Sequence, residues 1–292
     1  MTVSIIGGDK RQVYLAGYFI QAGCSVITYG LPPYLIDSNC HAASSLAEAM
    51  SGSRYIISSI PLSRDGKNLT ALDPFHIGLK DFLSHLTSEH TLFAGNIHYL
   101  AADYCEQNHI PYYDLMQDNQ VAILNAVSTA EGAIMKAIEK STITLHQNRC
   151  LVLGYGRCGQ VLASRLKGLN ASVNVAARKA DALAKAKAAG CKALDLKHLD
   201  SALPDYPFIF NTVPYCVLNH SLLKKIDDEG VIIDIASAPG GVDYDAAKKL
   251  GINATLYLGI PGKTAPRSAA LILGDKILEL IRSSEPKPFI KL

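Results

Sequence analysis

Residues 150–159 read CLVLGYGRCG, a short apolar run followed by glycines at 154, 156 and 159 in a GxGxxG spacing. The residues that follow, 158–169, carry apolar side chains at helical intervals. A strand, a glycine turn and a helix in this order form a dinucleotide-binding βαβ unit, because the glycines permit a tight turn, close approach of a pyrophosphate and close helix packing. The pyrophosphate is expected at the free N–H groups of the helix start. The predicted cofactor-binding residues of this turn are Gly154, Tyr155, Gly156, Arg157, Cys158 and Gly159.

The same alternation of short β-branched runs and Ala-rich stretches extends over the chain. We predict strands at 3–6, 25–28, 55–59 and 91–94 in the first half, and at 150–153, 172–176, 208–212, 231–235 and 254–258 in the second. Strand, helix, strand at this spacing implies right-handed crossovers and parallel pairing. The predicted fold class is therefore α/β: two open parallel-sheet, Rossmann-like domains with a cleft between them.

Two helices are expected to link these domains. Residues 118–140 carry apolar side chains at steps of three and four, with Asp118 or Asn119 as the cap. Pro266 suits the first turn of a final helix. The predicted organisation is a substrate domain at 1–118, a connecting helix at 119–142, a dinucleotide-binding domain at 143–265, and a C-terminal helix and tail at 266–292 that pack back on the first domain.

The composition argues against several classes of protein. Of the 292 residues, 49% are hydrophobic and 18% charged, which supports a sizeable core. A net charge of +2 without like-charge blocks argues against nucleic-acid or membrane-surface binding. No apolar run reaches the ~18 residues of a membrane helix, and the N-terminal residues lack a signal-peptide layout. The seven cysteines form no CxxC pair and the nine histidines show no ligand spacing, so we expect a cytoplasmic protein without a metal site.

The end of the second predicted strand bears on the choice of nucleotide. Sites for NAD place an acidic residue about 20 positions after the first glycine, where it holds the ribose 2′-hydroxyl. Here Arg178 and Lys179 occupy this region, and no acid precedes Asp181. A guanidinium binds a 2′-phosphate through two charge-assisted bonds, whereas a carboxylate would repel it. The sequence favours NADP, with NAD still open as the cofactor.

Two further strand ends are expected at the same crevice, since ligands of open α/β sheets bind beyond the carboxyl ends of the strands. One is the run Asn211, Thr212, Val213 and Pro214, whose backbone and hydroxyl can lie along the ribose and nicotinamide. The other is 234–241, whose small residues, including Ala236 and Ser237, leave room for a flat ring.

Two basic corners suggest an anionic substrate. After the strand at 3–6 comes a glycine turn with Lys10 and Arg11, which we interpret as a small-anion site; a capped helix start with solvated basic residues is the alternative. A Gly/Pro-rich loop at 259–267 carries Lys263 and Arg267. Two cationic corners favour a substrate with two carboxylates.

The connecting helix carries polar groups midway along its length. Asn125 and Thr129 share a face with Gly132, and either a cleft-lining substrate site or close helix packing accounts for this pattern. Asp9 and Glu131 are the candidate catalytic bases.

Taken in order, these motifs resemble the A-subunit family of dipicolinate synthases over nearly the whole chain. The segments that carry the resemblance are GGDKRQVYLA at 7–16, NAVSTAEGAI at 125–134, VLGYGRCG at 152–159, AAR at 176–178, NTVP at 211–214, DIASAPGGVD at 234–243 and LGIPGKTAPRSAA at 258–270. Ser128 and Cys158 are minor departures, at positions where other small residues are expected.

The resemblance implies an NADP-linked oxidoreductase that aromatises a dihydro- or 4-hydroxytetrahydro-dipicolinate to dipicolinate during sporulation, on a branch of the lysine pathway. It implies that the partner is a flavoprotein-like B subunit and that the location is the mother-cell cytoplasm, and we expect a homo-oligomer. Two alternatives stay open. One is a reductase of the shikimate dehydrogenase kind, although its Lys–Asp pair has no matching motif here. The other is a non-enzymatic NADP(H)-sensing module.

Overall fold

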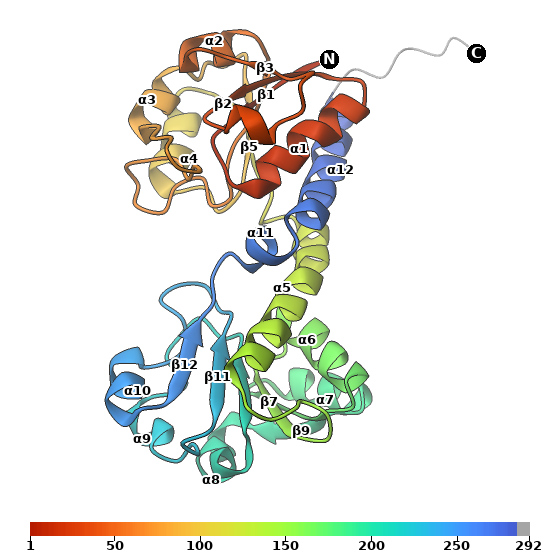
Figure 1. The fold of residues 1–292 in the computed structure, drawn as a ribbon, viewed down its shortest axis with the longest axis vertical. Coiled ribbons are helices and arrows are strands. Elements are labelled where there is room, and N and C mark those ends of the chain that lie inside the picture. The colour runs from red at the N-terminus through yellow and green to blue at the C-terminus, as the bar shows by residue number, and fades with distance from the viewer. Residues whose placement is uncertain (285–292) are drawn as a thin grey trace, which may run out of the picture. The chain divides into compact units, whose positions relative to one another are not determined.

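The computed structural model describes residues 1–284, and the chain divides into two compact units (Figure 1). The first contains Met1–Ala122 and the segment that starts at Ala265, and the second is Ile123–Thr264. Each is an open parallel sheet covered by helices, so the predicted α/β class with Rossmann-like sheets is confirmed.

The first unit is built on a six-stranded sheet in the order β3-β2-β1-β4-β5-β6, with every neighbouring pair parallel. Its strands are β1 (Thr2–Ile6), β2 (Ser25–Tyr29), β3 (His41–Ala42), β4 (Tyr55–Ile57), β5 (Thr91–Ala94) and β6 (Tyr112–Asp114). Its helices are α1 (Lys10–Gln21), a 3-10 turn (Pro33–Leu35), α2 (Leu46–Ser51), α3 (Leu79–Ser84), α4 (Tyr99–Gln107) and α12 (Pro266–Ser284). The strand order is that of doubly wound folds, in which ligands bind where the order reverses, here between β1 and β4.

The second unit repeats this topology in the order β12-β11-β10-β7-β8-β9, again entirely parallel. Its strands are β7 (Arg149–Leu153), β8 (Ser172–Ala177), β9 (Lys192–Asp195), β10 (Phe208–Asn211), β11 (Val231–Asp234) and β12 (Asn253–Leu256). Its helices are α5 (Asn119–Lys140), which enters this unit at Ile123, α6 (Arg157–Gly168), α7 (Ala180–Ala188), two 3-10 turns (Leu196–His198 and Leu203–Asp205), α8 (Leu199–Ala202), α9 (His220–Leu223), α10 (Tyr244–Leu250) and α11 (Ile260–Thr264). The point of reversal lies between β7 and β10.

Successive strand residues bury opposite faces of each sheet, as the period of two requires. In β7, Cys150 and Val152 join the core beneath α5 and α6, whereas Leu151 and Leu153 join the core beneath α8, α9 and α10. All four side chains are fully buried, which explains why the central strands are continuously apolar.

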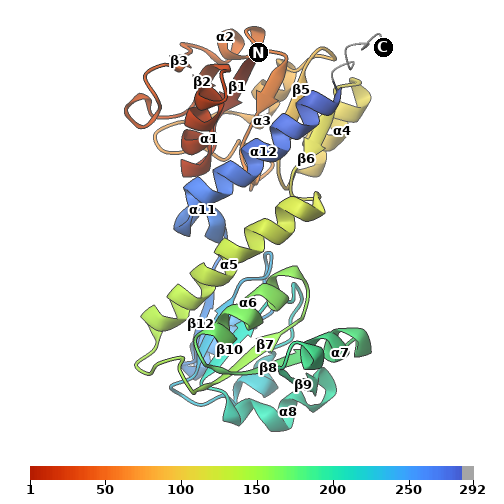
Figure 2. The same ribbon diagram turned by 90° about the vertical axis from the view of Figure 1, so that its right-hand side faces the viewer.

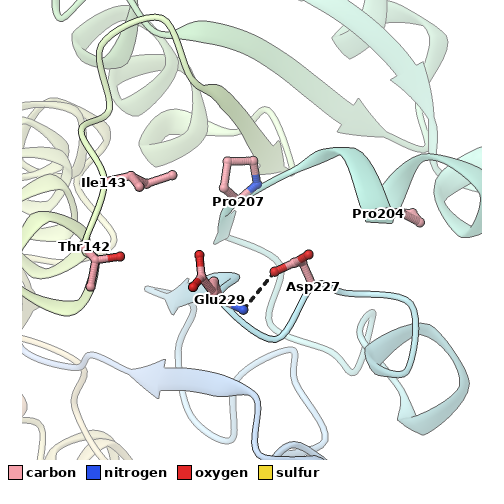
Figure 3. A pocket seen from close by; sticks show the side chains of 6 residues that line it. All are labelled: Thr142, Ile143, Pro204, Pro207, Asp227 and Glu229. Atoms are coloured by element: carbon pink, nitrogen blue, oxygen red, sulfur yellow. Dashed lines mark hydrogen bonds between the residues drawn. The ribbon is translucent and has the colours of Figure 1, made fainter.

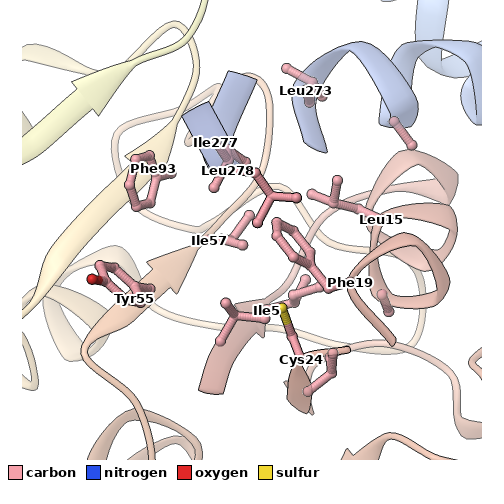
Figure 4. Packing of buried hydrophobic residues seen from close by; sticks show 14 of the residues in the cluster. Ile5, Leu15, Phe19, Cys24, Tyr55, Ile57, Phe93, Leu273, Ile277 and Leu278 are labelled. Carbon is pink, nitrogen blue, oxygen red and sulfur yellow. The ribbon is translucent and has the colours of Figure 1, made fainter. Parts of the chain in front are cut away.

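Helix α12 closes one face of the first unit. It runs alongside α1 (Figures 1 and 2) and buries Leu273 and Ile277 against Leu15 and Phe19 (Figure 4). The Tyr18 hydroxyl of α1 donates a 2.6 Å hydrogen bond to Asp275. The C-terminal part of the predicted tail, from residue 285, lies outside the described residues.

Helix α5 is shared between the two units. Asp118 is its cap, accepting a 2.9 Å hydrogen bond from the Val121 N–H, and Val121 belongs to the core of the first unit. Ala130 and Ala137 belong to the core of the second. Among the described helices, α5 alone is long and apolar enough to cross a membrane by length and composition, and 44% of its most apolar 18-residue window is buried inside the structure.

Candidate functional site

All the predicted cofactor residues lie at one edge of the second sheet. They follow β11, β10, β7 and β8, which are neighbours in that order. The four segments are 236–237, 211–214, 154–159 and 178–179. Because carboxyl ends of parallel strands meet at one edge, the structure brings these segments together at the reversal point of the sheet.

Two of the three fingerprint glycines are required by neighbouring atoms of the protein, and the third faces open space. Gly154 has a φ of +90°, and a Cβ there would overlap the Thr212 hydroxyl. Gly159 lies so close to Gly154 that a Cβ would overlap the Gly154 carbonyl oxygen. Gly156 instead has no atom within 4 Å of an added Cβ, so open space lies in front of its backbone.

This open space fits a pyrophosphate. Gly156 is the N-cap of α6 and, having no side chain, forms no side-chain cap bond. A helix start with bare N–H groups and the positive end of the helix dipole binds phosphate oxygens. The residues present therefore fit the phosphates of a dinucleotide.

The side chains inside the glycine turn are unreactive. Burial raises the pKa of the Cys158 thiol, although the neighbouring Arg157 opposes this shift. Burial also raises the pKa of Tyr155. Both groups therefore stay protonated at neutral pH, and neither is a nucleophile or a base.

The ribose end of the edge is basic. Arg178 and Lys179 are both exposed after β8, and Lys179 is the N-cap of α7 without a side-chain cap bond. The nearby acid Asp181 lies 3.8 Å from Lys185 on the same helix. Cations and uncapped N–H groups thus occupy the place where NAD sites carry a carboxylate.

Asp234, the last residue of β11, organises the opposite end of the edge; it begins the predicted segment 234–241, but the sequence reasoning gave its side chain no role. One carboxylate oxygen accepts hydrogen bonds from the Asn211 amide (2.8 Å) and the Ala236 N–H (2.9 Å). The other accepts from the Gly241 N–H (2.6 Å) and the Tyr244 hydroxyl (2.7 Å). A lone acid ending an otherwise apolar strand, VIID, was the available signal.

Further hydrogen bonds fix the loop after β10. The Thr212 hydroxyl donates to the Leu153 carbonyl (2.9 Å), and the Asn211 side chain brackets Val213 at its N–H and its carbonyl. A Cβ at Gly241 would overlap the Asn211 amide, so this loop and the loop after β11 pack directly on each other.

The predicted anion corner of the first unit is largely neutralised. Arg11 is buried, and its guanidinium donates to both oxygens of Asp9, with Nη2 2.8 Å from Oδ2, and to the Ile60 carbonyl. Asp9 is also the N-cap of α1 and forms a capping box with Gln12. The carboxylate predicted as a base is therefore engaged by a cation, which leaves Lys10 as the exposed charge of this corner.

The remaining candidates of the second unit lie on α5 and α11. Thr129 donates its hydroxyl to the Asn125 carbonyl (2.9 Å), and Glu131 is exposed. Asn125 is buried with its side-chain oxygen unpartnered. A Cβ on Gly132 would overlap Ile260, so this glycine serves close helix packing.

The prediction of a Gly/Pro-rich loop at 259–267 is corrected by the structure. Residues Ile260–Thr264 form the short helix α11, since Pro261 is tolerated in a first turn and the Thr264 hydroxyl bonds the Ile260 carbonyl. Lys263 lies 5.2 Å from the Tyr257 ring centre in the second unit, whereas Arg267 is in α12 of the first. The two cations therefore lie on successive helices that belong to different units.

Two hollows among the described residues lie at the other ends of the strands. A cavity of about 230 Å³ is lined by Pro207 and Glu229, which precede β10 and β11, together with Asp227 and Ile143 (Figure 3). A more open hollow in the first unit is lined by residues 51–54 and 87–90, before β4 and β5. Both are at amino ends of strands, away from the cofactor edge.

The fold and the glycine edge define a two-unit α/β protein of the NAD-binding dehydrogenase class. Residues 126–246 match the NAD binding domain of D-isomer specific 2-hydroxyacid dehydrogenases. Residues 2–116 match the N-terminal domain of dipicolinate synthase A subunits.

Comparisons over the whole chain find more similar proteins within this class. The chain is 29% identical to the dipicolinate synthase A subunit of Bacillus subtilis (strain 168), over 98% of this chain and 99% of that protein. The crystal structures of the dipicolinate synthase A subunits from Bacillus halodurans and Bacillus subtilis give TM-scores of 0.89 and 0.86, each at 27% identity and 98% coverage of both chains. Over 98% of its length, the chain is therefore similar to the dipicolinate synthase A subunits, as the motifs indicated.

Proposed function

We propose that this protein oxidises a dihydrodipicolinate to dipicolinate with NADP⁺. The ring loses one hydride and one proton, so dihydrodipicolinate and NADP⁺ give dipicolinate, NADPH and H⁺. A 4-hydroxytetrahydro substrate would in addition lose one water. Aromatisation of the ring drives the reaction forward, so the demand on acid–base groups is modest.

The observation that carries this proposal is the match of the first unit. A nucleotide-binding unit such as 126–246 serves many dehydrogenases, but residues 2–116 match the N-terminal domain described for dipicolinate synthase A subunits. The substrate of this chain is therefore inferred from the first unit and the cofactor from the second.

NADP is proposed over NAD because of the ribose end of the edge. Arg178 and Lys179 stand at the end of β8, next to the uncapped start of α7. These groups favour a 2′-phosphate by charge-assisted hydrogen bonds.

The chain's own groups bind and orient the dicarboxylate. A bound nicotinamide supplies the hydride acceptor. Lys10 of the first unit and Lys263 of the second, both exposed, are the proposed carboxylate-binding cations, with Arg11, Asn125, Thr129 and Arg267 as further candidates. Holding the ring by both ends lowers the entropic part of the barrier. Glu131 is the exposed candidate for the proton, whereas Asp9 must first release Arg11.

We further propose that the partner is a flavoprotein-like B subunit, that the chain assembles into a homo-oligomer, and that it works in the cytoplasm of a sporulating mother cell. These proposals follow from the relationship to the dipicolinate synthase A subunits.

The test follows NADPH and dipicolinate by their absorbances while purified protein is supplied with the cyclic lysine-pathway precursor and NADP⁺. The proposal expects both signals to rise together, with or without added B subunit. Binding of the cofactor without turnover in both cases would indicate a sensing module. Turnover of shikimate but not of the pyridine precursor would indicate a reductase of the shikimate dehydrogenase kind.

A further inference from the structure

The carboxylate of Asp234 is buried, with 0% of its residue surface exposed, and accepts four hydrogen bonds. Three of the donors are amide N–H groups, which cannot accept, and the fourth is the Tyr244 hydroxyl. Burial, the hydrogen bond to Asp234 and the charge of Asp234 all raise the pKa of Tyr244, so this hydroxyl keeps its proton and donates it. Four converging donors hold an ionised, acceptor-only carboxylate.

This negative charge has no cationic partner. None of the ion pairs formed within residues 1–284 includes Asp234, and its four donors are all uncharged groups. Burying an ion without a counter-ion is costly, and hydrogen bonds offset only part of that cost. A buried negative charge without a counter-ion therefore exerts an electrostatic force on any charged group close to it.

The position of Asp234 identifies the part of the cofactor it acts on. Along the edge, Arg178 follows β8, the glycine turn follows β7, and Asp234 ends β11 on the far side of β10. With the 2′-phosphate at Arg178 and the pyrophosphate at the glycine turn, the nicotinamide half extends toward β10 and β11. This placement rests on the proposed cofactor function.

We propose that Asp234 makes the site bind the oxidised cofactor more tightly than the reduced cofactor. The two forms carry the same phosphates but differ by one positive charge on the nicotinamide ring. A fixed negative charge in a poorly solvated site attracts the cationic ring and does not attract the neutral one. An enzyme that oxidises its substrate then takes up NADP⁺ readily and releases NADPH.

The experiment compares dissociation constants of NADP⁺ and NADPH by calorimetry, for the full chain and for Asp234→Asn. We expect the wild type to bind NADP⁺ more tightly, and Asp234→Asn to weaken NADP⁺ by on the order of tenfold more than NADPH. The control, Tyr244→Phe, removes one donor but keeps the charge, and should leave the ratio of the two constants unchanged.

If Asp234→Asn weakened the binding of NADP⁺ and of NADPH equally, the proposal would be overturned. An Asp234 that only holds the surrounding loops in place predicts that result. If Asp234→Asn does not fold, the wild type decides: tighter binding of NADPH than of NADP⁺ contradicts the proposal. A wild type that binds neither nucleotide refutes the proposed function itself, and with it this inference.

Discussion

Within the glycine motif at the predicted cofactor edge, single residues differ in what constrains them. Gly159 is required by the Gly154 carbonyl, which is part of the protein, whereas Gly156 faces open space that only a ligand would fill. Gly159 is therefore expected to matter for stability, and Gly156 for ligand binding.

Gly156→Val and Gly159→Val should have opposite effects. Gly156→Val should leave the melting temperature close to that of the wild type but weaken dinucleotide binding at least tenfold, because the side chain occupies the ligand's space. Gly159→Val should lower the free energy of unfolding by roughly 1–3 kcal/mol, since backbone must move. Thermal unfolding and calorimetric titration measure both; equal destabilisation by the two variants would contradict the assignment.

Arg178→Ala should weaken NADP⁺ far more than NAD⁺. A charge-assisted bond to phosphate contributes about 1.5–3 kcal/mol, which corresponds to roughly tenfold or more in affinity. NAD⁺ lacks the 2′-phosphate and should be little affected. Titration of both nucleotides is the measurement, with the exposed Lys192→Ala of β9 as a matched surface control. An equal loss for both nucleotides would show that Arg178 does not read the phosphate.

At the scale of elements, the starts of two helices, α1 and α5, are fixed by acidic caps that also contact a cation. Asp9 caps α1 and pairs with Arg11, and Asp118 caps α5 and lies 3.0 Å from Lys276 of α12. A cap of this kind orients a whole helix, so sequence-local chemistry positions distant elements.

Asp118→Asn should reveal the charge part of this cap, since asparagine is also a good N-cap. The hydrogen bond from the Val121 N–H and then the Lys276 ammonium lower the pKa of Asp118. The resulting stabilisation is present above the unfolded-state pKa of about 4 and is lost as pH falls through the lowered folded-state value. We expect a loss of about 0.5–1 kcal/mol at pH 7 that disappears in strong acid.

Denaturant unfolding across this pH range gives the measurement. In a Lys276→Met background, Asp118→Asn should cost less than in the wild type, because only the hydrogen bond from the Val121 N–H still favours the carboxylate. A loss in the free energy of unfolding that does not change with pH would mean that the ion pair between Asp118 and Lys276 does not stabilise the protein.

At the scale of the whole molecule, the two units differ in how their cores are assembled. The clusters of the second unit draw on residues 130–252 alone. The first unit needs a distant segment, since Leu273, Ile277 and Ile281 of α12 complete the core around Leu15 and Phe19.

Residues 123–264 expressed alone should therefore fold and bind the dinucleotide, whereas residues 1–122 alone should not fold. Exposing the core face beneath α12 forfeits about 1.5–3 kcal/mol for each large side chain, comparable in sum with the stability of a domain. Amide dispersion in NMR spectra distinguishes the outcomes. A folded 1–122 fragment would show that α12 is dispensable.

Much of the fold was predictable because its signals are local. The glycine fingerprint, the apolar central strands and the cap at Asp118 are all contained within short windows, and the structure confirms them. The edge strands β3, β6 and β9 were not predicted, since none of their residues is buried and they carry no apolar pattern.

The sequence by itself determined the open parallel sheets and predicted the line of cofactor residues, because strand period and turn chemistry depend on neighbouring residues. Only the tertiary structure decided the state of the charged groups. Arg11 bonds the carbonyl of Ile60, 49 positions away, and Asp234 bonds Asn211, 23 positions away. Whether a charge is free or engaged depends on which distant backbone and side-chain groups the folded sheets place beside it, and no local pattern encodes those partners.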